Sequence, residues 1–210
     1  MQKLNGFERE MFDVDKDVSD MGLLCLKAVH NTMNAFEKQD KELAQKIVEG
    51  DKPIDAYYKQ IEQETLKIML LDQPYASEFR NMGVALKMIT DLERIGDYCV
   101  DIDEEILAFP KEPYYPKTDK IMQMFGCVES MVSKALKSYN DRDVPAARSL
   151  DKDDDRVDQL FIEEKNDLIE LLRKKESPYD DQTIVFMMIA KYLERIGDHA
   201  VNIGEWIDYS

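Results

Sequence analysis

The hexapeptide Leu-Glu-Arg-Ile-Gly-Asp occupies residues 92–97 of this chain and occurs again, unchanged, at residues 193–198. The two copies lie 101 residues apart (193 − 92 = 101), which is about half of the 210-residue chain. An identical hexapeptide at that distance indicates an internal duplication, and a duplication constrains the fold more strongly than any local pattern. The chain is therefore predicted to consist of two related units.

Two features of the hexapeptide are unfavourable in an ordinary helix. Glu93 and Asp97 are like charges at i and i+4, which cost roughly 0.2–0.5 kcal/mol, and Gly96 in a helix interior costs about 1 kcal/mol relative to Ala. Both costs recur in the second copy. A cation beside the acids, with a close approach of another segment at the glycine, would offset them. The simpler alternative is an exposed acidic stripe with a glycine that lets two helices touch.

Composition favours a helical protein with protein or cation partners. Hydrophobic residues make up 44% of the chain and charged residues 34%, whereas Gly and Pro number only 8 and 7, which favours long helices over strands and turns. The formal net charge of −16 argues against nucleic acid or an anionic membrane surface as a direct partner. Cations and basic protein surfaces are the expected partners.

The cysteines and the hydropathy pattern indicate a cytoplasmic location. Cys25, Cys99 and Cys127 are scattered and form no Cys-x-x-Cys motif, so they are expected to be reduced thiols. The first twenty residues are polar and acidic, so no signal peptide is expected. The longest apolar run, residues 184–190, is far shorter than the roughly 20 residues that span a bilayer.

Apolar residues recur at helical spacing in three segments of the first unit. The first predicted helix covers residues 7–38. The second begins after a capping Asp40 and continues to residue 70, with a kink or short break at Gly50 and Pro53. The third covers residues 75–107 and carries the first hexapeptide.

Three prolines between residues 110 and 116 interrupt the helical pattern and predict a semi-rigid linker over 109–117. The same pattern then returns: a helix capped by Asp119, a second opened by Asp143 and Pro145, and a third opened by Ser177-Pro178 that ends near Trp206. The predicted fold is all-α, with two tandem three-helix bundles related by internal duplication. The predicted units are residues 1–108 and 118–210.

The second helix of each unit carries its own pair of acids at i and i+4. In an antiparallel hairpin, residues equidistant from the turn lie level, because both helices rise about 1.5 Å per residue. Pairing the helix acids with the hexapeptide acids gives one midpoint per unit: residue 74, in the predicted turn of the first unit, and residue 176, one residue before the Ser177-Pro178 that opens the last helix. Each unit is thus expected to bring four carboxylates together: Asp51, Asp55, Glu93 and Asp97 in the first, and Asp154, Asp158, Glu194 and Asp198 in the second.

Four carboxylates at such a distance repel one another, by on the order of 3 kcal/mol for a pair 5 Å apart at an effective dielectric constant near 20. A hard or borderline cation such as Mg, Mn or Fe(II) would relieve this repulsion, with zinc as a further possibility. The alternative is a solvated acidic face. Asp101 and Asn202 continue the same helical faces, but their level partners are apolar, so they are left out of the ligand set. Arg94 and Arg195 are expected to form surface ion pairs.

The sequence resembles the PhoU family of phosphate-transport regulators over nearly its whole length. The resemblance is carried by the two hexapeptides, by Asp-Lys-Pro-Ile-Asp at 51–55, by Gln-Pro-Tyr-Ala-Ser-Glu-Phe-Arg at 73–80 and by Arg-Asp-Val at 142–144. It implies two three-helix bundles with multinuclear metal clusters on Glu/Asp-x-x-x-Asp motifs, which fall here on the eight acids named above. Iron is the metal expected from the resemblance, with Zn, Mn or Mg as alternatives.

The resemblance also implies a non-enzymatic role. Members of the family restrain phosphate uptake and phosphate-starvation signalling by acting on the phosphate ABC transporter ATPase and a sensor kinase, and so reach the membrane only through their partners. Two alternatives are considered: a di-metal carboxylate enzyme, for which His199 is the residue that would support the chemistry, and a metal-free helical scaffold. A homodimer contact through Trp206 is also considered. The sequence departs from the family pattern at Pro53, inside the acid motif, and at Asp101, where the family commonly has Asn.

Overall fold

The computed structural model describes residues 6–50, 52–71, 75–109, 117–174 and 179–209. Within these ranges every regular element is an α-helix and no strand occurs, so the all-α prediction is confirmed. The helices are α1 (Gly6–Lys38), α2 (Lys41–Glu49), α3 (Lys52–Leu71), α4 (Ala76–Ala108), α5 (Asp119–Asp141), α6 (Val144–Arg148), α7 (Leu150–Leu172) and α8 (Asp180–Tyr209).

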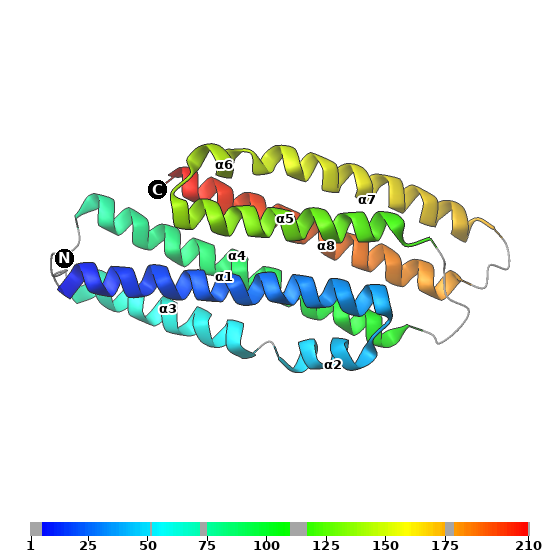
Figure 1. Cartoon of the computed structure of the whole chain (residues 1–210), viewed down its shortest axis with the longest axis horizontal. Coiled ribbons are helices and arrows are strands. Elements are labelled where there is room, and N and C mark those ends of the chain that lie inside the picture. Colours follow the sequence, from blue (N-terminus) through cyan, green and yellow to red (C-terminus); the bar gives the residue numbers. More distant parts are fainter. Residues whose placement is uncertain (1–5, 51, 72–74, 110–116, 175–178, 210) are drawn as a thin grey trace.

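The helices run along one long axis as two bundles that lie side by side (Figure 1). The first bundle consists of α1, α4 and the interrupted pair α2–α3, and the second of α5, α8 and the interrupted pair α6–α7. The prediction of two tandem three-helix bundles is thus confirmed. Helices α4 and α8 carry the hexapeptides and form the most extensive helix–helix contact of the molecule. The duplication therefore joins its two units through the helices that carry the repeat.

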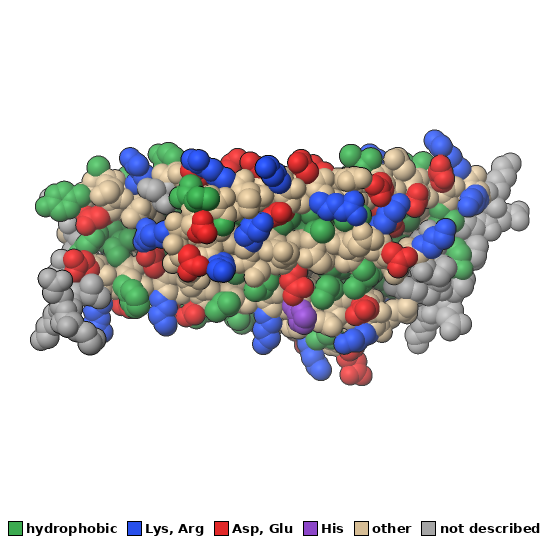
Figure 2. All heavy atoms as spheres, turned by 45° about the horizontal axis from the view of Figure 1, so that its top comes forward, with side chains coloured by type: hydrophobic (Ala, Val, Ile, Leu, Met, Phe, Trp, Pro, Cys, Tyr) green, Lys and Arg blue, Asp and Glu red, His purple; other side chains and the backbone are tan. Residues whose placement is uncertain are grey.

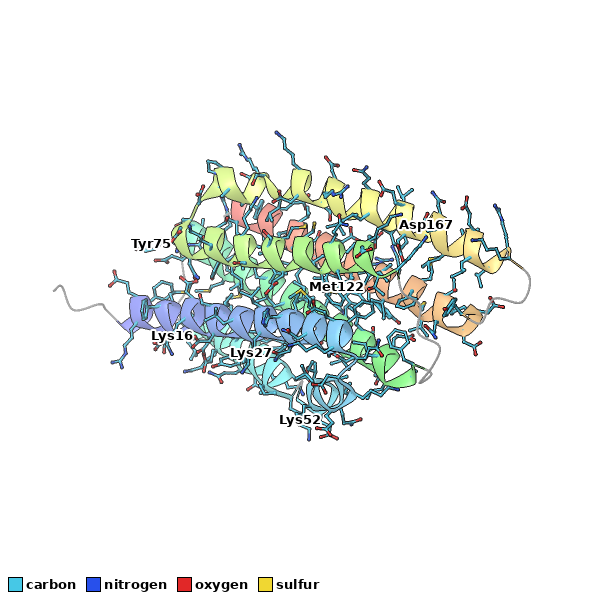
Figure 3. The ribbon with its side chains drawn as sticks, turned by 45° about the vertical axis from the view of Figure 1, so that its right-hand side comes forward. Lys16, Lys27, Lys52, Tyr75, Met122 and Asp167 are labelled. Carbon is cyan, nitrogen blue, oxygen red and sulfur yellow. The ribbon has the colours of Figure 1, made fainter. Side chains whose placement is uncertain are left out.

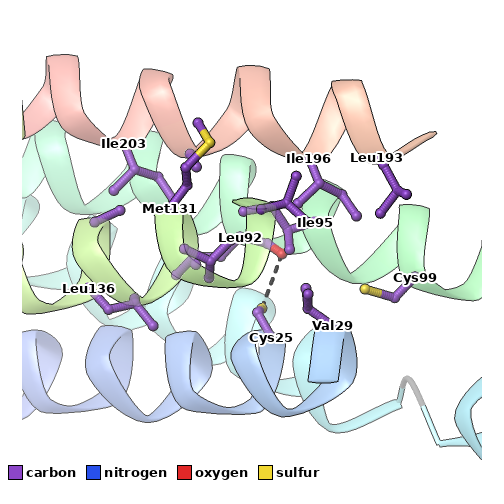
Figure 4. Close-up of a cluster of buried hydrophobic side chains, with 14 of the residues drawn as sticks. Cys25, Val29, Leu92, Ile95, Cys99, Met131, Leu136, Leu193, Ile196 and Ile203 are labelled. Carbon is purple, nitrogen blue, oxygen red and sulfur yellow. Dashed lines mark hydrogen bonds between the residues drawn. The ribbon is translucent and has the colours of Figure 1, made fainter. Parts of the chain in front are cut away.

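One hydrophobic core spans both bundles. In Figure 4, Ile95 of α4 lies beside Ile196 of α8, and Leu92 and Leu193 also belong to the buried cluster, so the apolar half of each hexapeptide points into this core. Cys25 of α1 donates a hydrogen bond from its thiol to the carbonyl oxygen of Leu92, at 3.2 Å (Figure 4). In the second copy, Gly197 lies against α7 of its own bundle.

The partition into residues 1–108, a 109–117 linker and 118–210 stays a prediction, and residues 110–116, with their prolines, lie outside the described part of the chain. Phe109, at the start of that linker, is buried and lies 6.3 Å from Phe36 and 5.3 Å from Phe186, measured between ring centroids. Phe125 lies 5.5 Å from Phe36 and completes the aromatic cluster. These rings come from both units, so the core is shared rather than divided.

The predicted caps and break are largely confirmed. The side chain of Asp40 accepts hydrogen bonds from two backbone N–H groups of α2, and Asp143 accepts one from Ala146. Helix α2 ends at Glu49 and α3 begins at Lys52, as expected from Gly50 and Pro53. The cap predicted at Asp119 is wrong, because Thr118 precedes the helix and Asp119 is its first residue. The turn at Pro74 and the helix start at Ser177-Pro178 fall outside the described residues.

A second helix break was not predicted. The helix opened by Asp143 stops after Arg148, and α7 begins at Leu150. A Cβ on Gly204 of α8 would lie 2.9 Å from the carbonyl oxygen of Ala147, so the short α6 is packed directly against the α8 backbone. The break thus coincides with a close tertiary contact. None of the described helices is long and apolar enough to cross a membrane.

Candidate metal centre

The second carboxylate group lies between α7 and α8, which pack against each other in the second bundle. Asp154 and Asp158 come from α7, and Glu194 and Asp198 from α8. The closest contact is at Gly197, where a Cβ would lie 2.6 Å from Oδ1 of Asp154. Residue 154 thus lies level with residue 197, within one residue of the register predicted by counting from the turn. The absence of a side chain at Gly197 is what admits the Asp154 carboxylate to the α8 backbone.

Asp154 is the member of this group with the most unusual environment. Its Oδ1 is buried, and no described residue donates a hydrogen bond to it. A buried carboxylate oxygen without a partner is costly, and such an oxygen often marks an ion or water that the protein atoms alone do not show. Asp154 therefore fits a role as a ligand for a cation between α7 and α8.

The other three acids of this group contribute to the electrostatic environment of Asp154. Burial and then the negative charges of Asp158, Asp198 and Glu194, in that order, together raise the pKa of Asp154 to about 7. The pKa of Asp198 is also raised, first by burial and then by Glu194, while Arg195 and Lys191 lower it. A divalent cation would reverse this repulsion, and the carboxylates would then be held ionised.

The Glu194 carboxylate is engaged by neighbouring bases. Nζ of Lys191 lies 2.5 Å from each of its oxygens, and Nε of Arg195 lies 3.9 Å from one of them. With the side chains in these positions, no three His, Cys, Asp or Glu residues of the described part of the chain are arranged as a metal-binding group. For Glu194 to ligate a cation, Lys191 would have to be displaced from its carboxylate.

The first carboxylate group differs in its surroundings. Asp55 of α3 and the α4 residues Glu93 and Asp97 are all half-buried, and Asp51 lies outside the described residues. Arg94 bridges the two α4 acids: its Nη1 donates to Asp97 at 2.9 Å, and its Nε lies 3.7 Å from Glu93. The predicted surface ion pairing of Arg94 is confirmed, and it supplies positive charge that partly neutralises this group.

Beside the first group, a groove of about 380 Å³ opens at the break between α2 and α3. Gly50 and Pro53 line it from the break, Gly96 from the first hexapeptide, and Lys27 from α1. Figure 3 labels Lys27 on α1 and Lys52, the first residue of α3. In the second bundle α7 continues without interruption past Asp154. The same hexapeptide thus faces an open helix break in one bundle and a continuous helix in the other.

Asp101 and Asn202 were left out of the predicted ligand sets, and the structure gives Asn202 a different role. Its side-chain N–H donates to Oδ1 of Asp91 on α4 at 3.1 Å. The same oxygen lies 2.8 Å from Nδ1 of His199, and the indole N–H of Trp206 donates to the other oxygen at 2.9 Å. Asp91 is only 7% exposed, so three α8 side chains satisfy a nearly buried carboxylate across the α4–α8 interface.

Sequence reasoning missed this network because the hairpins were counted one bundle at a time. A signal was present: Asp91 lies next to the buried Leu92, three residues after the buried Met88, so it belongs to the buried face of its helix. The duplication relates Asp91 to Tyr192 and His199 to Tyr98 (offset 101), and these two tyrosines stack with ring centroids 5.8 Å apart. One interface position is therefore polar, and its repeat equivalent is aromatic.

Comparison with known proteins agrees with the arrangement of the chain as two related bundles. A family model described as "PhoU domain" matches residues 18–106 and 121–207, one match in each bundle. The chain belongs to the PhoU family. It is 34% identical, over 95% of this chain and 91% of the relative, to the "Phosphate-specific transport system accessory protein PhoU homolog" of Clostridium acetobutylicum. It is 31% identical, over 97% of this chain and 88% of the relative, to PhoU homolog 1 of Thermotoga maritima.

Solved PhoU structures have the same architecture. PhoU from Pseudomonas aeruginosa superposes with a TM-score of 0.92 at 29% identity, covering 97% of both chains. The phosphate transport system regulatory protein PhoU from Streptococcus pneumoniae superposes with a TM-score of 0.90 at 25% identity, covering 97% of this chain and 95% of that one. The paired-bundle arrangement is thus shared with these PhoU proteins over nearly their full length.

Proposed function

We propose that this chain is a cytoplasmic regulatory protein of phosphate-specific transport. It restrains phosphate uptake and phosphate-starvation signalling through contacts with the transporter ATPase and a sensor kinase, and it catalyses no reaction. The observation that carries this proposal is the family relationship over both bundles, to proteins named as accessory or regulatory components of phosphate transport. The net charge of −16 supports basic protein surfaces as the contact sites.

The proposal includes a metal site in each bundle. The residues that would hold the metal are Asp154, Asp158, Glu194 and Asp198 in the second bundle, with the corresponding Asp51, Asp55, Glu93 and Asp97 in the first. All-carboxylate sets suit iron, with Mn, Mg and Zn as alternatives. A bound metal would supply positive charge that joins α7 to α8, and α3 to α4. The buried, unpartnered oxygen of Asp154 beside Gly197 supports this part of the proposal.

The enzyme alternative has little support in the structure. His199, the residue that would assist di-metal chemistry, is directed at Asp91 across the α4–α8 interface, and its ring lies 5.7 Å from that of Tyr98. It is thus engaged in the contact between the two bundles rather than aimed at the carboxylates of α7. A scaffold without metal remains the competing interpretation, and metal analysis of the purified protein distinguishes it.

Deletion of the gene in its own host tests the regulatory role. In medium rich in phosphate, the deletion strain is expected to express its phosphate-starvation genes and to take up phosphate without restraint. Reintroducing the wild-type gene should restore repression. Normal repression in the deletion strain would contradict the proposed function. Pull-down of the transporter ATPase and sensor kinase by the tagged protein then tests which contact carries the signal.

A further inference from the structure

The end of the molecule where α4 begins and α8 ends carries an open groove of about 440 Å³. One wall is a stripe along the first three turns of α4, from Ala76 to Lys87, and the other is formed by Trp206 and Tyr209 of α8. The α4 stripe is about 16 Å long at 1.5 Å per residue. Tyr75, placed at this end of the molecule in Figure 3, is 82% exposed and is the N-cap residue that precedes α4.

The groove combines exposed aromatic surface with positive charge. Phe79 is 56% exposed and Tyr209 is 64% exposed, and both line the same groove, so they form a shared exposed aromatic surface. Arg80 lies over the ring of Tyr209 and Lys87 over the ring of Trp206, each 5.7 Å from the ring centroid. Aromatic side chains beside Arg are typical of the residues that dominate binding energy at protein interfaces.

The charge of the groove is opposite to that of the protein as a whole. Of the described residues that line it, Arg80 and Lys87 are charged and none is acidic. Neither base forms an ion pair with a carboxylate of the described chain, although acids outnumber bases by 44 to 28 in the whole sequence. Elsewhere the surface mixes the two signs, as Figure 2 shows for the face it presents. The groove thus offers two cations without carboxylate partners against an apolar wall.

The groove is not a by-product of the duplication. One repeat further along the chain (offset 101), Arg80 corresponds to Asp181 and Trp206 to Glu105. The related place, where α8 begins and α4 ends, therefore carries acids in these positions. At these equivalent positions a base and a Trp occur at one end of the α4–α8 pair and acids at the other, so the two ends are chemically distinct.

One wall of the groove is ordered, and the surface at Gly83 is open. The hydrogen bond from the Trp206 indole to Asp91 holds the ring in place, so little side-chain freedom would be lost on binding. A Cβ on Gly83, which lines the floor, would meet no atom within 4 Å. The floor is therefore open, and the groove can receive a side chain without rearrangement.

From these observations we infer that the groove binds an acidic amphipathic peptide segment of a partner protein. Apolar side chains of the segment, at helical spacing, lie against Phe79, Trp206 and Tyr209, and its carboxylates pair with Arg80 and Lys87. The trough is open and about three helical turns long, which suits a helix laid into a groove. The inference concerns a surface apart from both carboxylate groups and does not require metal.

The test uses Trp206 as an intrinsic reporter, because it is the only Trp in the chain. The probe is a synthetic peptide of about 14 residues with Phe and Leu at i, i+3, i+4 and i+7 and Glu elsewhere. Titration into the full-length protein is expected to shift Trp206 emission saturably, with an affinity that falls as salt increases. The same peptide with Lys in place of each Glu is expected to cause no saturable shift. Equal binding of the two peptides, or no shift with either, would overturn the inference.

Two variants locate the binding site. Gly83→Leu fills the floor of the groove while raising helix propensity, and the paired change Arg80→Glu with Lys87→Glu reverses its charge. Each is expected to weaken peptide binding by about tenfold or more. Unchanged affinity in both, with circular dichroism matching the wild type, would show that the peptide binds elsewhere and would refute the inference.

Matched controls exist for both variants. Gly126→Leu places the same residue at a second helical glycine whose Cβ would meet no atom within 4 Å, and Lys59→Glu with Lys165→Glu makes the same charge change at two exposed positions. Both controls are expected to bind the peptide as the wild type does. Sedimentation velocity completes the test: if the groove variants instead dissociate a wild-type dimer that no peptide displaces, the occupant is a second copy of the chain and the inference is wrong.

Discussion

The two bundles carry the same hexapeptide but place it in different surroundings. In the second bundle α7 passes unbroken along α8, and Asp154 reaches the α8 backbone at Gly197 with a buried oxygen that no described residue contacts through a hydrogen bond. In the first bundle the facing helix is interrupted between α2 and α3, and Arg94 already bridges Glu93 and Asp97. Identical local sequence therefore does not give identical sites.

The difference follows from what faces each hexapeptide. A neighbouring base, as at Arg94, satisfies carboxylates at a half-buried position without any ligand. A buried carboxylate among three others gains much more from a cation, because its repulsion is less screened by water. We therefore expect the second site to bind metal more tightly than the first, and the following predictions test how far the two bundles differ.

The largest expected effect concerns Asp103, an acid of the first bundle whose repeat equivalent is Gly204 (offset 101). Asp103 is fully buried with a single hydrogen bond, from Thr32 at 2.6 Å, and burial raises its pKa to about 7. Because the folded pKa is raised, stability is present at low pH and is lost as pH rises from about 4 through 7. The wild type should lose roughly 2–3 kcal/mol of unfolding free energy between pH 5 and pH 8 through this group, and Asp103→Asn should abolish that loss.

Urea unfolding of chelator-treated protein at several pH values measures this effect. The exposed neighbour provides the control, and Glu104→Gln is expected to leave the pH dependence of stability as it is in the wild type. If Asp103→Asn and the wild type lose stability in parallel from pH 5 to pH 8, the assignment of this pH dependence to Asp103 is wrong.

A second prediction compares the polar and the aromatic positions of the α4–α8 interface. Asp91→Ala leaves the donors of His199, Asn202 and Trp206 without their acceptor and should destabilise the protein by about 2–3 kcal/mol. Tyr98→Leu removes only the stack on Tyr192 and should cost about 1 kcal/mol. Thermal unfolding measures both, and a larger effect for Tyr98→Leu would reverse the assigned importance of the two positions.

A third prediction concerns Asp154→Asn, whose effect on stability should be favourable without metal and unfavourable with it. Without metal, Asp154→Asn removes one charge from a repelling group and should stabilise the protein by about 1 kcal/mol. With Mn²⁺ or Fe²⁺ added, the wild type should gain more in melting temperature than the variant. The same change at Asp55 should shift metal-free stability by no more than about 0.5 kcal/mol. Destabilisation by Asp154→Asn in chelator would contradict the repulsion that the structure shows.

The smallest effect on stability is expected at Gly197. In Gly197→Ala the new Cβ would lie 2.6 Å from Oδ1 of Asp154, the far end of a side chain that can rotate away. The gain in helix propensity, about 1 kcal/mol, offsets that shift, so stability should change little while metal affinity falls about tenfold. Isothermal titration with Mn²⁺ measures the affinity. Gly126→Ala, which meets no atom within 4 Å, serves as the control that keeps wild-type affinity.

The features that depend on local chemistry could be predicted from the sequence. The break at Gly50 and Pro53 and the caps at Asp40 and Asp143 follow from backbone preferences. The helical rise predicts the register of α7 on α8 to within one residue, since it places residue 154 level with 198 and the structure has it level with 197. The features that depend on contacts between distant helices could not. The break after Arg148 lies where α6 approaches Gly204 of α8, and the role of Asp91 depends on three residues more than 100 positions away.

The central claim, that the paired carboxylates hold metal and do so more tightly in the second bundle, is tested most directly by metal content. Elemental analysis would compare the wild type with two variants, each loaded with metal and then dialysed against the same limiting chelator. The first-site variant carries Asp55→Asn, Glu93→Gln and Asp97→Asn, and the second-site variant carries Asp158→Asn, Glu194→Gln and Asp198→Asn. We predict that the wild type retains metal, that the first-site variant keeps most of it, and that the second-site variant loses most of it. Equal metal content in all three proteins, or none in the wild type after loading, would contradict the account.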